Sequence, residues 1–513
     1  MEKLQMIKSN DRKIAGTLVV AVSLTPILIF VAQFFQRANF PAHLEIMEGQ
    51  NLFHCWRVAC GLPLYVEPSI EAISPPYFPL FYYVVALLMK IVGPQWWTGR
   101  LVSFLSALGI GALYYHVGRR ESGARLWGVV AAGLFFGAYG LTGAYYDLFR
   151  VDSLPLFLGF AAFTMAVYRQ SWAAVAGASI LLFLAVAGKQ TELALWPVIL
   201  LTLLFVNRKK GLAFAFTSLV FIAVFVWLFN ASTSGWFIKY TIDMVGHHAL
   251  HKAHQRIFPI WILRHFGIPL ACIVFYGTSI LFHRKLNRKL SRIFTEPWFY
   301  FIGSSLLTSF LIYRIHGSYL NSLIPAAMGM IAGLVVFAPR LWRDYNPKLP
   351  GFAHSLAPWA LILFVGITLW MQDFPFALKH PLTRQVPTEK HREAARHFNE
   401  YVHAHHGVIY TPFHTLPANP NWNLPHNVPL RDLKESPWGK SYHDQIMVDL
   451  ENLGIDQVIL KRRRRVPHRY RKLLKDFDGP TRLPKNMRIN PRPLTTWPKA
   501  LYKRNEYADT PMP

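Results

Sequence analysis

Long apolar segments recur along most of the chain and are separated by short connections that carry Lys and Arg. Each segment is close to the length of a helix that crosses a bilayer, roughly 17–25 residues, and lacks the alternation typical of barrel strands. Because a spanning helix satisfies its own backbone hydrogen bonds, this pattern predicts an all-α polytopic membrane protein. The apolar segments cover residues 14–36, 77–92, 101–118, 126–144, 153–168, 172–187, 191–206, 212–230, 257–282, 297–313, 318–338 and 356–371.

The second apolar segment, from Pro76 to Gly93, decides the topology. If it crossed the membrane, the basic connections would fall on opposite faces, against the positive-inside tendency. Its prolines, Lys90 and the nearby Trp96 and Trp97 instead favour a helix at the interface. About eleven spans then remain in an inner (plasma) membrane, and the basic connections share its cytoplasmic face: 3–13, 119–125, 208–210, 284–292 and 340–348.

The same topology places a first outer loop, residues 37–100, on the extracytoplasmic side. From about Gln372 the chain loses its long apolar runs and becomes rich in Pro, His and Arg, which predicts a soluble domain at 372–513 after a membrane domain at 1–371. Two short apolar runs, 406–412 and 455–461, are expected to be buried strands beside helices. The predicted soluble domain is a small extracytoplasmic α/β domain with a basic tail.

Composition agrees with this class, since 53% of the 513 residues are hydrophobic and only 16% are charged. The net charge of +27 would suggest nucleic acid as the partner of a soluble protein. Here much of that charge lies beside spans and in the tail, so anionic lipid head groups and phosphates are the expected partners and nucleic acid is not.

Several charged residues gather in the outer segments. Acids beside spans are costly unless they are solvated or used, so Glu48 and Asp152 are candidate functional residues. A single loop acid is as often simply hydrated, but a cluster is harder to explain in that way. Carboxylates supply a general base, while Arg and Lys neutralise a phosphate. The cluster also contains Arg57, Asp147, Arg150 and Lys189, and its composition suggests transfer from a phosphate leaving group.

Three consecutive stretches carry a resemblance to a known family. The run EGQNLFHCWRVACGLPLYVEP, followed by PYFPLFYYVVALLMKIVG and TGRLVSFLSAL, resembles the GT-C superfamily of polyprenyl-phosphate-sugar glycosyltransferases, in the part nearest protein mannosyltransferases and lipid A aminoarabinose transferases. The shared pattern is an acidic pair that opens the first outer loop, a turn at Gly61, Pro63 and Tyr65, a Pro-led aromatic helix, and an Arg that starts the next span.

The resemblance continues through YDLFRVDSLPLFL and AGKQTELALWP, where the family carries a second outer acid and often a Lys, and it covers about the first 340 residues. It implies membrane-bound transfer of one sugar, with inversion, from a polyprenyl-phosphate donor to a glycan, lipid or protein acceptor of the cell envelope. The chain departs from the family at Met47, where the family often has Asp before the Glu. The acid role therefore rests on Glu48, with Glu45 in reserve.

The remaining roles follow from the resemblance and from charge. Glu48 is the expected base, and Asp152 is expected to share that role or to orient the acceptor. Arg150, Lys189 and Arg256 are expected to hold the phosphate, with Arg314 and His316 as further candidates for the phosphate or sugar, although capping of a helix end explains those two equally well. Because cations can stabilise the departing phosphate, no metal or other cofactor is required, though a divalent metal is possible.

Two further features have simpler explanations. His247, His251 and His254 share one helical face and fit a divalent metal, but a hydrated polar face is commoner. The run KRRRR at 461–465 is best explained as a hydrated surface, and less well by attraction to anionic lipid or a polyanionic glycan.

Two rival functions also stay open: a transporter or flippase of lipid-linked saccharides, and a glycan polymerase or ligase with a pyrophosphate-linked donor.

Overall fold

The computed structural model describes residues 2–169, 171–282, 295–345, 359–370, 386–411, 424–460, 473–483, 485–487 and 500–504. The basic connection at 284–292, part of the one at 340–348, the run at 461–465 and the expected domain boundary at 371/372 lie outside these residues.

Each of the eleven expected spans corresponds to a helix. The helices are α1 (Glu2–Arg37), α4 (Trp96–Ser122), α5 (Arg125–Gly137), α6 (Ser153–Tyr168), α7 (Trp172–Gly188), α8 (Trp196–Val206), α9 (Arg208–Ser232), α12 (Lys252–Phe282), α14 (Pro297–Tyr313), α15 (Ile324–Tyr345) and Trp359–Trp370.

Five of these helices are long and apolar enough to cross a membrane on their own: Lys13–Arg37, Trp96–Ser122, Arg208–Ser232, Lys252–Leu281 and Leu320–Tyr345. The last is 89% buried, whereas Arg208–Ser232 is 11% buried and turns Leu, Val, Phe and Trp side chains outward. Small residues let neighbouring helices approach α15, since Gly329 lies against Ser305 and Gly333 lies against Ile273. The predicted polytopic all-α class is confirmed.

One expected span is shorter than predicted. The apolar segment 126–144 forms α5 only as far as Gly137, and residues 138–152 follow as a buried segment without regular structure. Gly143 (φ 74°) and Ala144 (φ 58°) have left-handed backbone conformations, which a helix does not accept. Irregular backbone at this depth is tolerated because protein, rather than lipid, surrounds it.

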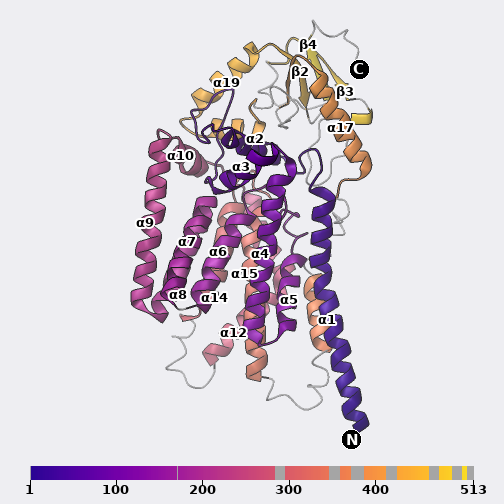
Figure 1. Cartoon of the computed structure of the whole chain (residues 1–513), viewed down its shortest axis with the longest axis vertical. Coiled ribbons are helices and arrows are strands. Elements are labelled where there is room, and N and C mark those ends of the chain that lie inside the picture. The colour runs from indigo at the N-terminus through magenta and orange to yellow at the C-terminus, as the bar shows by residue number, and fades with distance from the viewer. Residues whose placement is uncertain are drawn as a thin grey trace.

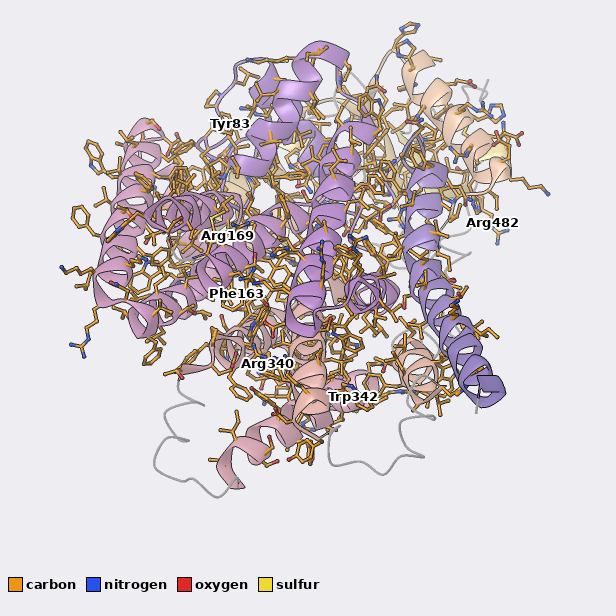
Figure 2. The ribbon with its side chains drawn as sticks, turned by 60° about the horizontal axis from the view of Figure 1, so that its bottom comes forward. Tyr83, Phe163, Arg169, Arg340, Trp342 and Arg482 are labelled. Atoms are coloured by element: carbon orange, nitrogen blue, oxygen red, sulfur yellow. The ribbon has the colours of Figure 1, made fainter. Side chains whose placement is uncertain are left out.

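Within the described residues, the basic connections 3–13, 119–125 and 208–210 and the start of 340–348 lie at the end of the bundle opposite the C-terminal domain (Figure 1). Figure 2, which brings this end forward, shows Arg340 and Trp342 there. Arg340 donates to Glu121 Oε2 (2.9 Å) and to Glu296 Oε2 (2.6 Å), so one guanidinium joins α4, α15 and the start of α14. Glu121 and Glu296 thus offset positive charge where these helices meet.

Two short helices, α2 (Glu48–Ala59) and α3 (Leu80–Val92), lie at the other end, beneath the C-terminal domain (Figure 1). With 13 residues, α3 is about 20 Å long. Its apolar face packs on the bundle through Phe81, Val85 and Met89. This placement agrees with the interfacial helix expected from the sequence.

The C-terminal domain is a small α/β unit. It contains α17 (Glu389–Ala404), α18 (Asn427–Glu435), α19 (Lys440–Asn452), β1 (Val408–Tyr410), β2 (Ile455–Leu460), β3 (Phe477–Arg482) and β4 (Ala500–Arg504). The sheet order is β1-β2-β4-β3, with β1 and β2 parallel and the other pairs antiparallel. The two strands predicted from apolar runs are thus β1 and β2, and most of their residues are buried.

This domain contacts the membrane domain at several places. On one side, Asn399 of α17 donates to the Pro41 carbonyl (3.0 Å). On the other, Trp438 packs on Trp236 of the short helix α10 (Trp236–Ile238), with ring centroids 5.7 Å apart, and the Tyr442 hydroxyl donates to Glu67 (2.7 Å). These contacts hold α18 over the mouth of the bundle.

Candidate functional site

The base predicted from the sequence, Glu48, is enclosed by the protein. Its carboxylate is fully buried and accepts from Arg100 Nε (3.0 Å) and Nη2 (2.8 Å), and from the backbone amides of Leu44 (2.5 Å) and Phe149 (2.8 Å). Burial raises the pKa of Glu48, but the Arg100 guanidinium and the amide donors outweigh it and lower that pKa overall. A carboxylate with this many donors is poorly suited to take a proton, so its geometry indicates a structural role.

Asp147 has a similar structural environment. Its Oδ1 accepts from the Tyr139 hydroxyl (2.7 Å), and its Oδ2 lies 3.3 Å from Arg37 Nε. Arg37 also donates to the Ala144 carbonyl (3.1 Å), at one of the two left-handed residues. Asp147 and Arg37 therefore hold the irregular segment 138–152 against the end of α1, and Asp147 does not line a cavity as a substrate-binding residue would.

The other predicted charges form one buried network. Arg150 Nη1 lies 3.3 Å from Glu45 Oε2, and Arg150 Nε lies 3.6 Å from Asp152 Oδ2. Lys189 Nζ donates to Asp152 Oδ1 (2.5 Å) from the end of α7, and Asn321 Nδ2 donates to Asp152 Oδ2 (3.1 Å). The structure thus brings four of the predicted residues together from three separate segments of the chain: Glu45, the Arg150–Asp152 pair and Lys189.

The two acids of this network differ in their proton affinity. Burial raises the pKa of Asp152, but Lys189 and Arg150 outweigh it and lower that pKa to about 2. Burial also raises the pKa of Glu45, and here Arg150 and the Met47 amide compensate only in part, so the pKa stays above its ordinary value. Glu45 Oε1 is buried without a hydrogen-bond partner within the described part of the chain. Of the two acids, Glu45 is better prepared to accept a proton.

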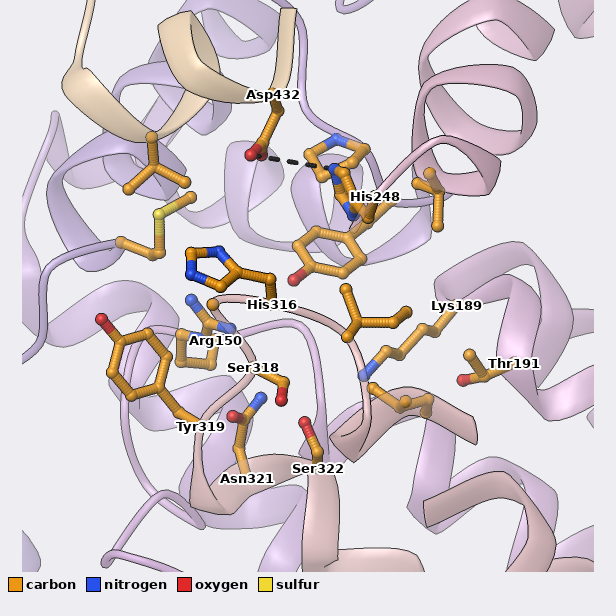
Figure 3. A pocket seen from close by; sticks show the side chains of 18 of the residues that line it. Arg150, Lys189, Thr191, His248, His316, Ser318, Tyr319, Asn321, Ser322 and Asp432 are labelled. Carbon is orange, nitrogen blue, oxygen red and sulfur yellow. Dashed lines mark ion pairs between the residues drawn. The ribbon is translucent and has the colours of Figure 1, made fainter. Parts of the chain in front are cut away.

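A cavity of about 210 Å³ lies beside this network, between the membrane domain and the C-terminal domain (Figure 3). Arg150 and Lys189 line it, while Asp152 lies directly behind Lys189. The loop that contains His316 is held by paired backbone bonds to the segment after α11 (Met244–Gly246), where the His251 amide donates to the Arg314 carbonyl (2.7 Å). The other walls include Met47, Tyr77, His248, His316, Ser318, Tyr319, Asn321, Ser322, Arg431 and Asp432.

Besides Glu45 and Asp147, three predicted contact residues do not line this cavity. Arg57 is partly exposed and donates to the Pro63 carbonyl (3.3 Å). Arg256 is exposed on α12, and Arg314 lies beside the His316 turn with only its backbone joined to the wall. Of the later candidates, only His316 faces the cavity. These placements give Arg57, Arg256 and Arg314 no direct part in the site as it stands.

Of the histidines considered for a metal, His251 and His254 lie together, with ring centroids 4.2 Å apart. His247 contacts Asp243, whereas His254 stacks on Tyr313 and its Nδ1 lies 2.8 Å from the Tyr313 carbonyl. Among the residues that the structure describes, no group of three or more His, Cys, Asp or Glu side chains is arranged to hold a metal ion. That the site works without a cofactor stays a prediction.

Several residues of the site were not identified from the sequence. Arg100 and Arg37 were noted only as segment ends, although each is buried on an acid of the cluster. Asn321 lies at the start of the apolar segment 318–338 and His248 lies in a polar loop, and neither has a distinctive spacing. Arg431 and Asp432 come from the C-terminal domain, whose sequence gave no hint of a contact with the site.

No protein-family model matches the chain, and no curated protein matches it in sequence. Two solved structures of ArnT from Cupriavidus metallidurans are similar to it in fold. The structure bound to undecaprenyl phosphate has a TM-score of 0.54 at 14% identity, covering 95% of this chain and 97% of ArnT. The apo structure has a TM-score of 0.58 at 14% identity, covering 96% and 99%. The similarity therefore extends over both the membrane domain and the soluble domain.

We expect Glu48→Gln to destabilise the protein rather than to impair chemistry alone. The change leaves the buried Arg100 guanidinium without a counter-ion, and breaking a buried ion pair costs about 3–5 kcal/mol. Thermal unfolding in detergent should show a large loss of stability, whereas Glu71→Gln, which changes an exposed acid, should not. A Glu48→Gln protein that unfolds like wild type but has lost its activity would instead support the base role predicted from the sequence.

The Asp152 ion pairs should stabilise the protein only above a definite pH. Because the pKa of Asp152 is lowered to about 2 in the folded state, its contribution is complete above the unfolded pKa of about 3.9 and is lost as the pH falls toward 2. The size expected is about 2–3 kcal/mol. The stability difference between wild type and Asp152→Asn should be constant from pH 5 to 7 and shrink between pH 4 and 2. A difference independent of pH would contradict this assignment.

Proposed function

Since the chain has the GT-C fold that its sequence resembles, we propose that it is an integral membrane glycosyltransferase. It moves one sugar, with inversion, from a polyprenyl-phosphate donor to an acceptor at the extracytoplasmic face of the inner membrane. The acceptor hydroxyl attacks the anomeric carbon and gives its proton to a base. The bond between that carbon and the phosphate oxygen breaks, and polyprenyl phosphate leaves.

The observation that carries this proposal is the pair of cations in the cavity. Arg150 and Lys189 line it from two different loops, and both are held in place by Asp152 behind them. Burial lowers the pKa of Lys189, but Asp152 outweighs it and keeps that pKa above its ordinary value, so the ammonium stays charged. Preorganised cations in a site with little water stabilise a phosphate that gains charge as it leaves. ArnT, which shares the fold, has been solved with undecaprenyl phosphate bound.

Glu45 is the carboxylate best suited to the base role. Its pKa is raised by burial, one of its oxygens has no partner within the described residues, and it contacts the Arg150 guanidinium. A raised pKa matches a base to work near neutral pH. Its neighbours Ile46 and Met47 line the cavity, so the carboxylate lies just behind the wall. Asp152 positions the two cations, and Glu48 stabilises the backbone around the site.

The transferase proposal is tested with purified protein in nanodiscs and a panel of polyprenyl-phosphate sugars, by measuring release of polyprenyl phosphate. Binding of undecaprenyl phosphate should weaken about tenfold or more in Lys189→Met, because a charged contact to phosphate is lost, and less in Lys189→Arg. Lys210→Met, at the opposite end of the bundle, is the control and should bind like wild type. Transport of the lipid-linked sugar without release of polyprenyl phosphate would favour a flippase instead.

Glu45→Gln should separate chemistry from binding. Loss of the base is expected to lower the turnover number by about 10²–10⁴-fold, while undecaprenyl phosphate binding stays close to that of wild type. A matched Asp152→Asn protein should lose binding as well as turnover, because the Arg150 and Lys189 side chains are no longer held. Wild-type turnover in a folded Glu45→Gln protein would exclude Glu45 as the base.

A further inference from the structure

The cavity has ends of different charge. Lys189 and Asn321 both bond to Asp152, which places the two cations toward the end formed by Asn321 and Ser322. Figure 3 shows Asp432 and His248 at the opposite end. Among the described residues that line the cavity, Asp432 is the single carboxylate. A ligand that fits this arrangement has an anion at one end and hydrogen-bond donors at the other.

Asp432 belongs to α18 of the C-terminal domain and is almost fully buried, at 5% exposure. Its Oδ1 accepts from Arg431 Nε (3.1 Å) and Nη2 (2.7 Å) and lies 3.7 Å from His248 Nε2. The described part of the chain provides no hydrogen bond or ion pair to Oδ2. One carboxylate oxygen is thus fixed in place, and the other is left for a ligand.

The two partners of Asp432 complete this end of the cavity. Arg431 lies over the turn at Gly317, where φ is +85° and an added Cβ would come within 2.9 Å of the guanidinium. His248 Nε2 is buried and forms no hydrogen bond within the described residues, although it lies near Asp432. This end of the cavity is therefore a polar wall with bonding capacity left for a ligand.

The charge at this wall narrows the kind of group it accepts. A phosphate would be repelled by Asp432 and is better placed between Arg150 and Lys189. An ammonium group would be repelled by Arg431, and a second carboxylate by Asp432. Neutral hydroxyl groups suit both partners, since they donate to Oδ2 and accept from a basic side chain.

We propose that Asp432 and His248 bind the hydroxyl groups of the transferred sugar, so that the C-terminal domain sets the specificity of the site for a neutral monosaccharide. This inference rests on the proposed transferase function. In this arrangement, the membrane domain binds the lipid phosphate, and the soluble domain binds the sugar that is attached to it. A buried site built to bond a hydroxyl group rejects ligands that lack it, because its own polar groups are left unpaired.

The test compares two ligand types on the full chain in nanodiscs. Undecaprenyl phosphate without sugar is titrated beside undecaprenyl phosphate that carries a neutral hexose, an amino sugar or a uronic acid. In wild type, the neutral sugar should increase affinity over the bare lipid the most. In Asp432→Asn this gain should fall about tenfold, with binding of the bare lipid unchanged. Asp432→Glu, which keeps the charge but moves it, should also reduce the gain.

The control is Asp444→Asn, an exposed acid of α19 in the same domain, which should keep both affinities. Equal loss of bare and sugar-carrying lipid in both Asp432 variants would overturn the inference, as would an unchanged gain or a wild-type preference for the charged sugars. Failure of wild type to bind undecaprenyl phosphate at all would overturn the transferase proposal itself. The bare lipid thus distinguishes the two failures.

Discussion

The ion pair between Arg100 and Glu48 joins the segments on which the site depends. Besides Glu48, the Arg100 guanidinium donates to the carbonyls of Arg37, Ala38, Phe40 and Ala42. Glu48 in turn accepts from two backbone amides, one of them Phe149 in the irregular segment before α6. The end of α1, the start of α2, α4 and segment 138–152 are therefore fixed to one buried pair. Desolvation makes each charge costly alone, and the dense set of bonds offsets that cost.

The charged residues around this pair form two sets, which differ in how many of their polar atoms already have a hydrogen bond or ion pair. Glu48 and Arg100 satisfy one another and the nearby backbone, and Asp147 and Arg37 do the same beside them. In the next layer, Arg150 and Lys189 face the cavity and share the single acid Asp152, while Glu45 keeps one oxygen unbonded. The fully bonded residues fix the backbone. The residues of the next layer can still form further hydrogen bonds or ion pairs, which a substrate requires.

The sequence was sufficient for the helical class because the apolar runs match membrane thickness, and for the outer cluster because topology brings its loops to one face. The sequence was not sufficient where an apolar, helix-like composition adopts a conformation other than a helix. Residues 138–144 are apolar and aromatic like a helix, yet Gly143 and Ala144 need left-handed backbone. Glu48 was identified without its partner, because Arg57 is nine positions along α2, on the opposite face, and Arg100 is 52 residues away. Asp432 was not identified because no periodicity links α18 to the cavity.

The irregular segment 138–152 also constrains how the protein is made. Turn hydrogen bonds within the segment satisfy part of its backbone, and side chains from other segments satisfy more: Arg37 donates to the Ala144 carbonyl and Glu48 accepts from the Phe149 amide. Lipid offers no substitute. Because these two side chains come from the end of α1 and the start of α2, we expect segment 138–152 to reach its final conformation only after those elements have packed beside it during folding.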